Sequence, residues 1–376
     1  MIKFWSYKKE YSKLKKIIIK KIDTTISKGE TFFGKELISF EKKFTSMYKS
    51  NYGIAVGSGT DALLIALRSI NIKKGDEIVT AANTAIPTIS AIINSGGVPR
   101  LVDIGEDYLI DCSKIEKAIT KKTKAIIPVH LYGQSCDMDK IIKISIKYNL
   151  KVIEDCAQAQ GAKYKKKFVG TIGDFGCFSF YPTKILGSYG DGGFILTKNI
   201  NFYKKIKRLR FYGIETHDKK NKFYNKYYAN ENGFNSRIDE IQCSILNIKL
   251  NYVDEFIKKR ISLANHYIKL LKNTDLILPY KSSQNNHVYH LFTVFHPKKD
   301  KIVKFLKKNK IETKSIYPFP IQSMRAYKQL NFKKNLQNSE KKAKGIFSLP
   351  LYPEMKKENV TKICGKIKTI LNSLKS

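Results

Sequence analysis

Short apolar runs alternate with amphipathic helical patterns between residues 52 and 197, and this alternation restricts the chain to few folds. Strand-like runs cover 77–80, 100–103, 125–130 and 151–154, and helical patterns cover 85–95, 113–120 and 137–148. Strands and helices that alternate in this way form βαβ units, whose parallel strands are covered by helices. We therefore expect an α/β fold with a mainly parallel sheet and with ligands at the carboxyl ends of its strands.

The pattern changes after about residue 255, where a smaller α+β unit is indicated. A helical pattern reaches Leu271, and we expect strands at 290–295 and 313–317, a helix at 301–309 and a final helix. A chain of 376 residues is long enough for two domains. We predict a large N-terminal domain over 1–250 and a small C-terminal domain over 251–376.

The formal net charge of +38 would suit a nucleic-acid-binding protein, but the kind of basic residue argues against one. Nucleic-acid binders concentrate arginine on one face or in one segment, because its guanidinium contacts phosphate and guanine in a bidentate way. Most of the 70 basic residues here are lysines, and they are spread over the whole chain. We expect no nucleic-acid partner, although a basic surface would attract a small anionic substrate.

Three further features indicate a cytoplasmic protein without metal. No run of about 18 apolar residues is present, so we expect no membrane span. The first residues carry no signal-type apolar core. The six cysteines form no Cys-x-x-Cys pair, which argues against a metal site and against a disulfide framework.

Lys184 has unusual surroundings for a lysine. It lies between an apolar strand-like run at 175–180 and a glycine-rich turn that leads into a second apolar run at 194–197. An ammonium group among apolar and aromatic residues loses hydration, which lowers its pKa and favours the neutral, nucleophilic amine. An isolated Pro-Thr-Lys is more often a loop lysine that caps a turn, but the upstream residues favour the nucleophile.

Asp155 ends the strand-like run 151–154, at the edge of the sheet where ligands bind. Taken alone, it is equally well explained as a helix N-cap. Together with Lys184 it indicates a pyridine cofactor, because such a cofactor needs an anion at its ring nitrogen and a lysine that holds its aldehyde.

The segment Gly57–Leu63 turns through glycines into a helix, as phosphate-binding loops do. Gly59 would allow a close approach, Thr60 would bind through its hydroxyl and amide, and Asp61 would bind through its amide. An ordinary capped helix start explains the same residues equally well. A later loop, 215–232, contains Tyr224, Tyr227 and Tyr228, which are either substrate contacts or packing residues.

Four segments in order resemble one family over nearly the whole chain. They are 57–63 (GSGTDAL), 154–161 (EDCAQAQG), 178–193 (FSFYPTKILGSYGDGG) and 233–242 (GFNSRIDEIQ). The chain resembles the DegT/DnrJ/EryC1/StrS family of pyridoxal-phosphate nucleotide-sugar aminotransferases, of fold type I. The resemblance implies a seven-stranded, mainly parallel large domain, a smaller C-terminal domain, and a homodimer with shared active sites.

The resemblance also implies roles for individual residues. Lys184 would form an imine with pyridoxal 5′-phosphate, Asp155 would pair with the ring nitrogen, and Gln158 would approach the ring hydroxyl. The phosphate would be held by Gly59, Thr60, the Asp61 amide, Ser179 and, from the other subunit, Asn235. Arg237 would bind the amino donor's carboxylate or the sugar substrate, and Tyr181 and Tyr317 would contact the substrate.

The form of the lysine motif resembles the branch that acts on 3-keto sugars. It implies transfer from L-glutamate to C-3 of a dTDP-linked 3-keto-6-deoxyhexose, in deoxyamino sugar and O-antigen lipopolysaccharide biosynthesis. A UDP-linked 3-keto or a 4-keto amino sugar is the alternative substrate. A same-fold dehydratase is another alternative, but such enzymes usually carry histidine in place of Lys184. A regulatory protein that kept the fold would not bind the cofactor.

Two positions depart from the family pattern. Ala85 stands where many relatives place an aromatic ring over the cofactor, so the ring must be covered in another way. Gln322 stands where the usual motif has histidine near the substrate. Neither departure affects the chemistry expected of Lys184.

Overall fold

A computed structural model describes residues 1–215, 227–279, 285–330, 332 and 336–375. Its central sheet has the strand order β1-β9-β8-β5-β4-β2-β3. These strands are β1 (Tyr52–Val56), β2 (Glu77–Ala81), β3 (Val98–Val102), β4 (Thr123–Ile127), β5 (Lys151–Asp155), β8 (Phe175–Ser179) and β9 (Gly193–Thr197). The strands from β3 to β8 pair in parallel, whereas β9 pairs antiparallel with β1 and β8. The predicted seven-stranded, mainly parallel α/β sheet is confirmed.

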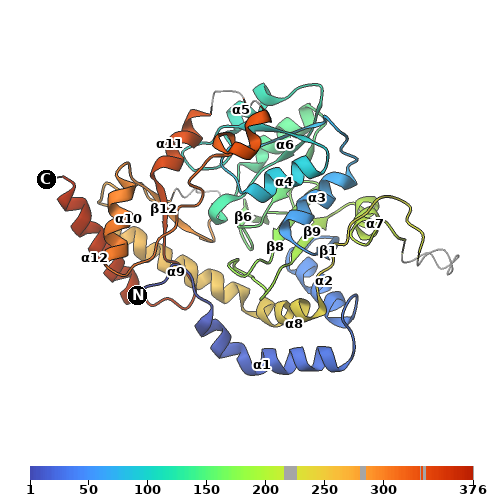
Figure 1. Ribbon diagram of the computed structural model, residues 1–376, viewed down its shortest axis with the longest axis horizontal. Helices are drawn as coiled ribbons and strands as arrows, with labels where there is room; N and C mark the ends of the chain where they lie inside the picture. The colour runs from blue at the N-terminus through green and yellow to red at the C-terminus, as the bar shows by residue number, and fades with distance from the viewer. Residues whose placement is uncertain (216–226, 280–284, 331, 333–335, 376) are drawn as a thin grey trace.

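Helices cover the sheet (Figure 1). Helix α3 (Gly59–Ser69) packs against α4 (Ile86–Asn94) and α7 (Ile200–Leu209), and α5 (Cys112–Ala118) packs against α6 (Met138–Lys147). Capping side chains begin several of them: Ser58 accepts from the Asp61 amide, and Asp137 accepts from the Lys140 amide. Strands β8 and β9 are buried along their whole length, which explains why they read as continuous apolar runs.

The C-terminal part of the chain packs around its own apolar cluster, which includes Leu263, Phe292 and Val360. Strands β11 (Phe292–Phe295) and β12 (Ile346–Leu349) pair antiparallel beside α9 (Val253–Leu271), α10 (Lys299–Lys308) and α12 (Lys357–Ser373). The amino-terminal residues join this part, because the Ile2 amide donates to the Lys310 carbonyl over 2.8 Å. Figure 1 accordingly shows both termini at this end of the molecule. The domain division at residue 250 stays a prediction.

The strand expected at 313–317 is wrong. Lys314 forms an isolated bridge with Ser348, and the chain then leaves the sheet. Pro318 and Pro320 follow directly, and proline has no N–H to donate to a strand ladder. The departure carries Tyr317 toward the carboxyl ends of the parallel strands instead.

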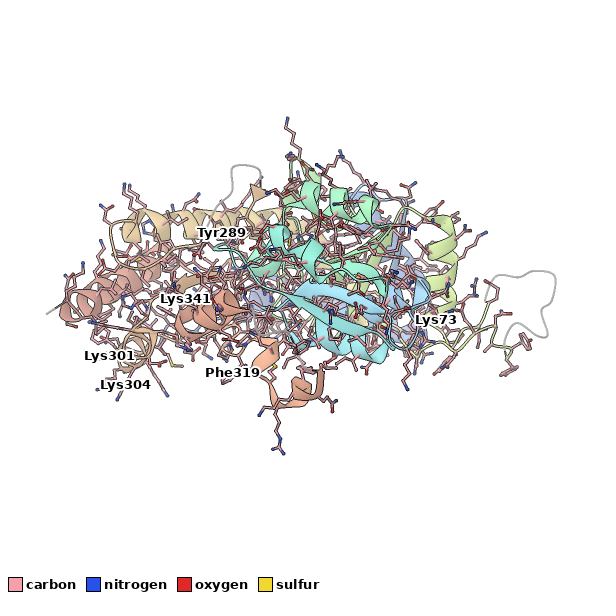
Figure 2. The ribbon with its side chains drawn as sticks, turned by 90° about the horizontal axis from the view of Figure 1, so that it is seen from above. Lys73, Tyr289, Lys301, Lys304, Phe319 and Lys341 are labelled. Atoms are coloured by element: carbon pink, nitrogen blue, oxygen red, sulfur yellow. The ribbon has the colours of Figure 1, made fainter. Side chains whose placement is uncertain are left out.

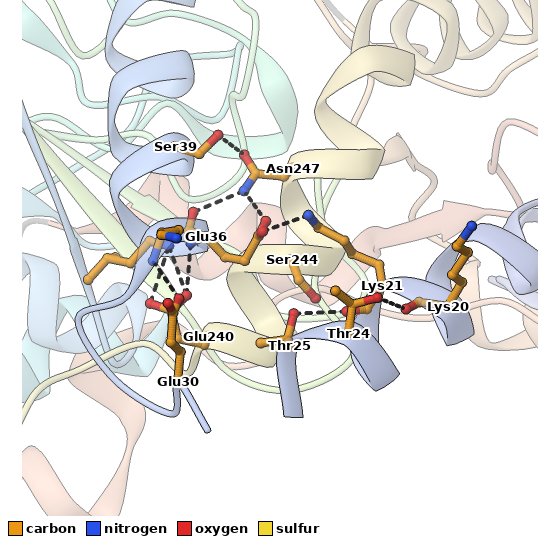
Figure 3. Close-up of polar contacts among 12 residues, drawn as sticks. Lys20, Lys21, Thr24, Thr25, Glu30, Glu36, Ser39, Glu240, Ser244 and Asn247 are labelled. Carbon is orange, nitrogen blue, oxygen red and sulfur yellow. Dashed lines mark hydrogen bonds and ion pairs between the residues drawn. The ribbon is translucent and has the colours of Figure 1, made fainter. Parts of the chain in front are cut away.

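A buried carboxylate joins three helices below the sheet (Figure 3). Glu240 begins α8 (Glu240–Lys249) and is fully buried. Its carboxylate accepts hydrogen bonds from three backbone amides at the start of α2 (Lys35–Met47), those of Gly34, Glu36 and Leu37. Glu36 then pairs over 2.6 Å with Lys21 of α1 (Lys8–Ser27). These contacts fix the position of α8 and of the segment that precedes it.

The lysines are dispersed over the surface. Lys301, Lys304 and Lys341 lie toward one end of the molecule in Figure 2, and Lys73 lies toward the other. Within the part of the chain that the structure describes, none of the helices combines the length and the apolar character that a bilayer span requires.

Candidate active site

Lys184 lies in the connection between β8 and β9, beside the carboxyl ends of the parallel strands. Burial lowers the pKa of its amine to about 8, and the negative charge of Asp155 opposes this shift. The structure therefore brings together the two residues that the sequence predicted as the centre of the site. An amine with this pKa is largely available as the neutral nucleophile in weakly basic solution.

Hydrogen bonds from other segments hold the Lys184 loop. Gln160 donates to the carbonyls of Ser179 and Leu186 and accepts from the Leu186 amide over 2.8 Å. Gln242 accepts from the Tyr189 amide over 3.0 Å. These glutamines lie in the segments 154–161 and 233–242, but no role was predicted for either of them from the sequence.

Lys249 also holds the loop that carries Lys184, a role that the sequence did not predict. Its buried ammonium donates to the Gly187 carbonyl over 2.5 Å and pairs with Glu10 of α1 over 2.7 Å. A buried lysine is common only where a carboxylate and hydrogen bonds compensate its lost hydration. That context depends on residues far away in the sequence, so no local signal identified Lys249.

Asp155 ends β5 and is only 5% exposed. Its Oδ1 accepts from the Ala157 amide over 3.1 Å, and its Oδ2 accepts from the Thr88 hydroxyl over 2.8 Å. Burial raises the pKa of Asp155, while these two donors and the charge of Lys184 lower it. The carboxylate is therefore fixed in orientation and keeps lone pairs for a positively charged ring nitrogen.

Gln158 connects two distant segments at the site. Its Oε1 accepts from the Tyr132 amide, and its Nε2 donates to the Tyr317 hydroxyl, both over 2.9 Å. Burial raises the pKa of the Tyr317 hydroxyl, which keeps it protonated. The second N–H of Gln158 is left for a further acceptor, as the expected contact with a ring hydroxyl requires. Tyr181, by contrast, is 53% exposed beside the lysine loop.

The amino end of α3 approaches the end of β8 closely. A Cβ atom on Gly59 would lie 2.6 Å from the Cβ of Ser179, so only glycine fits there. The first amides of a helix have no acceptor within it, which leaves the amides of Gly59 and Thr60 for an anion. The Asp61 amide donates to the Ser58 hydroxyl over 3.1 Å, as in the capped helix start that the sequence left open, and its contact with a phosphate stays a prediction.

Asn235 and Arg237 flank Ser236, which contacts the loop at the amino end of α3. Ser236 between them accepts from the Gly57 amide and donates to the Asp61 carboxylate over 2.8 Å. Asn235 is exposed, so its predicted contact in a second subunit stays a prediction. The Arg237 guanidinium lies 4.3 Å from the centre of the Phe32 ring.

The remaining expectations are placed as follows. Ala85 is the residue before α4, and Gln322 donates to the Ser339 hydroxyl over 3.1 Å, toward α11 (Gln337–Gly345). Tyr227 and Tyr228 are 84% and 59% exposed, so they do not pack in the core of this chain. Tyr224 lies outside the described residues.

Glu154, beside Asp155, serves the architecture of the site. It lies within metal-binding range of His130 and Cys156. Its carboxylate, however, contacts His130 Nε2 over 3.0 Å and accepts three amides, those of Gly170, Ile172 and Gly173. His130 Nδ1 accepts in turn from the Cys136 amide. These contacts occupy the ligand atoms of Glu154 and His130 and hold the 170–173 turn against β5.

The residues fit pyridoxal 5′-phosphate. A half-buried lysine amine with a lowered pKa, a buried carboxylate, an amide donor and a helix amino end are the groups that bind its aldehyde, ring nitrogen, ring hydroxyl and phosphate. All four come from segments that converge at one edge of the sheet.

Comparisons with known proteins agree with this arrangement. A transaminase from Aneurinibacillus thermoaerophilus named for dTDP-3-amino-3,6-dideoxy-alpha-D-galactopyranose is 40% identical over 96% of this chain and 98% of its own. An aminotransferase from Acidithiobacillus ferrooxidans named for UDP-N-acetyl-3-dehydro-alpha-D-glucosamine is 34% identical over 96% of both chains.

Solved structures extend the likeness to the fold. S. venezuelae DesV, crystallised with a ketimine intermediate, superposes with a TM-score of 0.93 at 32% identity and 98% coverage of both chains. Bacillus subtilis ntdA, with bound cofactor PMP, gives a TM-score of 0.86 at 32% identity, over 94% of this chain and 81% of that one. The matching family model spans residues 12–368, and this chain therefore belongs to the DegT/DnrJ/EryC1/StrS aminotransferase family.

Proposed function

We propose that this protein transfers an amino group from L-glutamate to C-3 of a dTDP-linked 3-keto-6-deoxyhexose. The chain is a sugar aminotransferase that uses pyridoxal 5′-phosphate and acts on nucleotide-linked keto sugars. The observation that carries the proposal is the half-buried Lys184, whose amine has a pKa of about 8, beside the buried Asp155 carboxylate. The product would be a deoxyamino sugar of the kind used in O-antigen lipopolysaccharide.

Pyridoxal 5′-phosphate supplies an aldehyde that binds amines and a ring that accepts electrons from the bond that breaks beside the amine. Lys184 holds that aldehyde in the resting protein. When L-glutamate displaces it, the freed amine accepts the proton from the α-carbon of glutamate. The same amine returns a proton to C-3 of the sugar in the second half of the reaction.

The other residues of the proposed site would orient the cofactor and the sugar. Asp155 holds a proton on the ring nitrogen, because a nearby carboxylate favours the charged ring. The amides of Gly59 and Thr60 and the Thr60 and Ser179 hydroxyls bind the phosphate. Gln158 uses its second N–H on the ring hydroxyl, and Tyr317 and Tyr181 face the sugar.

A homodimer completes the proposed site. Asn235 of a second subunit would reach the phosphate, which suits its exposed position in the single chain. Arg237 would bind the carboxylate of glutamate or the anionic sugar nucleotide.

The test offers purified enzyme and L-glutamate a dTDP-3-keto-6-deoxyhexose, the matching 4-keto sugar and a UDP-linked 3-keto N-acetylglucosamine. NMR of each product shows which carbon carries nitrogen. We expect amination at C-3 of the dTDP sugar. Preference for the UDP sugar would favour the alternative that the Acidithiobacillus relative supports. Amination at C-4, or loss of water without transfer of nitrogen, would reject the proposal.

A further inference from the structure

The Asp155 carboxylate depends on few donors for its charge. Among the described residues, its hydrogen bonds come from the Ala157 amide and the Thr88 hydroxyl. Burial favours the neutral acid, and the raised pKa of Asp155 shows that burial outweighs the donors. Each of the two hydrogen bonds therefore matters for keeping the negative charge.

Thr88 is itself oriented by a second hydroxyl. Its Oγ1 lies 2.9 Å from Oγ1 of Thr84, and both residues are buried. An ionised carboxylate can only accept, and Thr88 has a single hydroxyl proton. Thr88 must therefore donate to Asp155, and Thr84 must donate to Thr88. A protonated Asp155 would permit the reverse direction, so this order belongs to the ionised state.

The place of Thr88 in the fold adds to this effect. Thr88 lies in the first turn of α4, which starts at the carboxyl end of β2. The amino end of a helix carries partial positive charge and favours an anion that contacts it. Ala85 precedes the helix and offers no capping oxygen, and the Thr88 hydroxyl points to Asp155 and not to the helix amides.

We propose that Thr88 is a positioning residue that keeps Asp155 ionised and directed at the ring nitrogen, with Thr84 fixing the direction of its hydroxyl. The inference rests on the role proposed above for Asp155. The titratable groups whose charges act on Asp155, or that its charge acts on, are His130, Cys156, Cys177, Lys184 and Tyr317. Thr88 does not titrate and donates directly to the carboxylate, so its effect on Asp155 is the same at every working pH.

The test uses holoenzyme loaded with ¹⁵N-labelled pyridoxal 5′-phosphate, whose ring-nitrogen NMR shift reports protonation. Thr88→Val keeps the shape and removes the donor, whereas Thr88→Ser keeps the donor. We expect wild type and Thr88→Ser to give the protonated signal, and Thr88→Val to move toward the unprotonated one. The glutamate half-reaction of Thr88→Val should slow by about tenfold or more, as expected for a lost hydrogen bond to a charged group.

Asp155→Asn distinguishes a failure of the role proposed for Asp155 from a failure of the role proposed for Thr88. If Asp155→Asn leaves the protonated signal in place, the role proposed for Asp155 is wrong. If Asp155→Asn moves the signal and Thr88→Val does not, only the inference about Thr88 is wrong. If Thr88→Val does not bind cofactor, Thr84→Val takes its place in the test. We expect Thr84→Val to move the ring-nitrogen signal toward the unprotonated position, by a smaller amount than is expected for Thr88→Val. An unchanged signal in Thr84→Val would then reject the inference.

Discussion

At the scale of the residue, burial sets the chemistry of the candidate site. The same loss of hydration acts in opposite directions on its two central groups: it lowers the pKa of Lys184 and raises that of Asp155. Their mutual attraction limits both shifts. The site therefore holds a usable amine beside a carboxylate that needs donors, and the Ala157 amide and the Thr88 hydroxyl supply them.

The lowered pKa of Lys184 predicts a pH profile. In cofactor-free protein, the rate at which pyridoxal 5′-phosphate binds covalently should rise with pH and reach half its maximum near pH 8, because only the neutral amine reacts. An ordinary lysine is less than about 1% neutral at that pH. Stopped-flow absorbance measures the rate, and borohydride reduction followed by peptide mapping locates the label.

Two variants control this measurement. Lys184→Arg should abolish the label, whereas Lys301→Arg, at an exposed lysine of α10, should leave both rate and label unchanged. A profile that rises only above about pH 10, or a label on another lysine, would contradict the prediction.

At the scale of the element, one helix junction positions several site segments. Helix α8 begins at Glu240, directly after the segment that carries Asn235 and Arg237, and it contributes Gln242 and Lys249 to the lysine loop. Glu240 fastens this helix to α2 (Figure 3). A substitution at this junction should therefore lower the free energy of unfolding more strongly than it changes the geometry of the site.

Glu240→Gln tests this junction. The amide keeps the size of the carboxylate but loses its charge and one accepting oxygen, so amides of α2 are left unpaired in a buried place. We expect the free energy of unfolding to fall by about 2–4 kcal/mol, measured by urea denaturation. Glu255→Gln, which removes an exposed pair with Lys259, should change it by less than about 0.5 kcal/mol. Equal urea midpoints for the two variants would disprove the role of Glu240.

At the scale of the whole molecule, we expect the proposed site to be completed by a second chain. The described chain exposes Asn235 on its surface, although Ser236 beside it donates to the Asp61 carboxylate at the amino end of α3 in the same chain. The exposed apolar side chains of Phe32 and Phe33 lie in the same region, beside Arg237 and Arg210. A second subunit that covers this region would bring its own Asn235 to the neighbouring phosphate site.

Mixed dimers provide the measurement. Lys184→Ala and Asn235→Asp should each be nearly inactive alone. After the two are unfolded together and refolded, activity should return to about a quarter of the wild-type value, since half of the dimers are mixed and each has one intact site. If Asn235 acts within its own chain, the mixture stays inactive. Light scattering on each sample confirms the oligomeric state.

Local sequence was sufficient for the central residues and for most elements. The apolar runs predicted the strands of the parallel sheet, and the surroundings of Lys184 and the strand end at Asp155 predicted the two central groups. These signals are local, because the apolar neighbours of a lysine and the hydrophobic periodicity of a strand or helix can both be read within short segments. The prediction failed at 313–317, where two prolines direct the chain away from the sheet.

The residues that sequence reasoning did not identify share one property: each acts through a partner that is distant in the chain. Thr88 reaches Asp155, Gln160 holds Leu186, Lys249 holds Gly187, and Glu240 caps α2. At Asp61 the structure shows the helix cap that the sequence had left open beside a phosphate contact.

The sequence by itself determined the fold class and singled out Lys184 and Asp155 as the central pair that the structure brings together, because these depend on local hydrophobic pattern and on the chemistry of single side chains. Only the tertiary structure decided which hydroxyls and amides stabilise the charge of Asp155 and which side chains hold the lysine loop. Such contacts require groups from distant segments within about 3 Å of one another, and that proximity exists only once the sheet and its helices have packed.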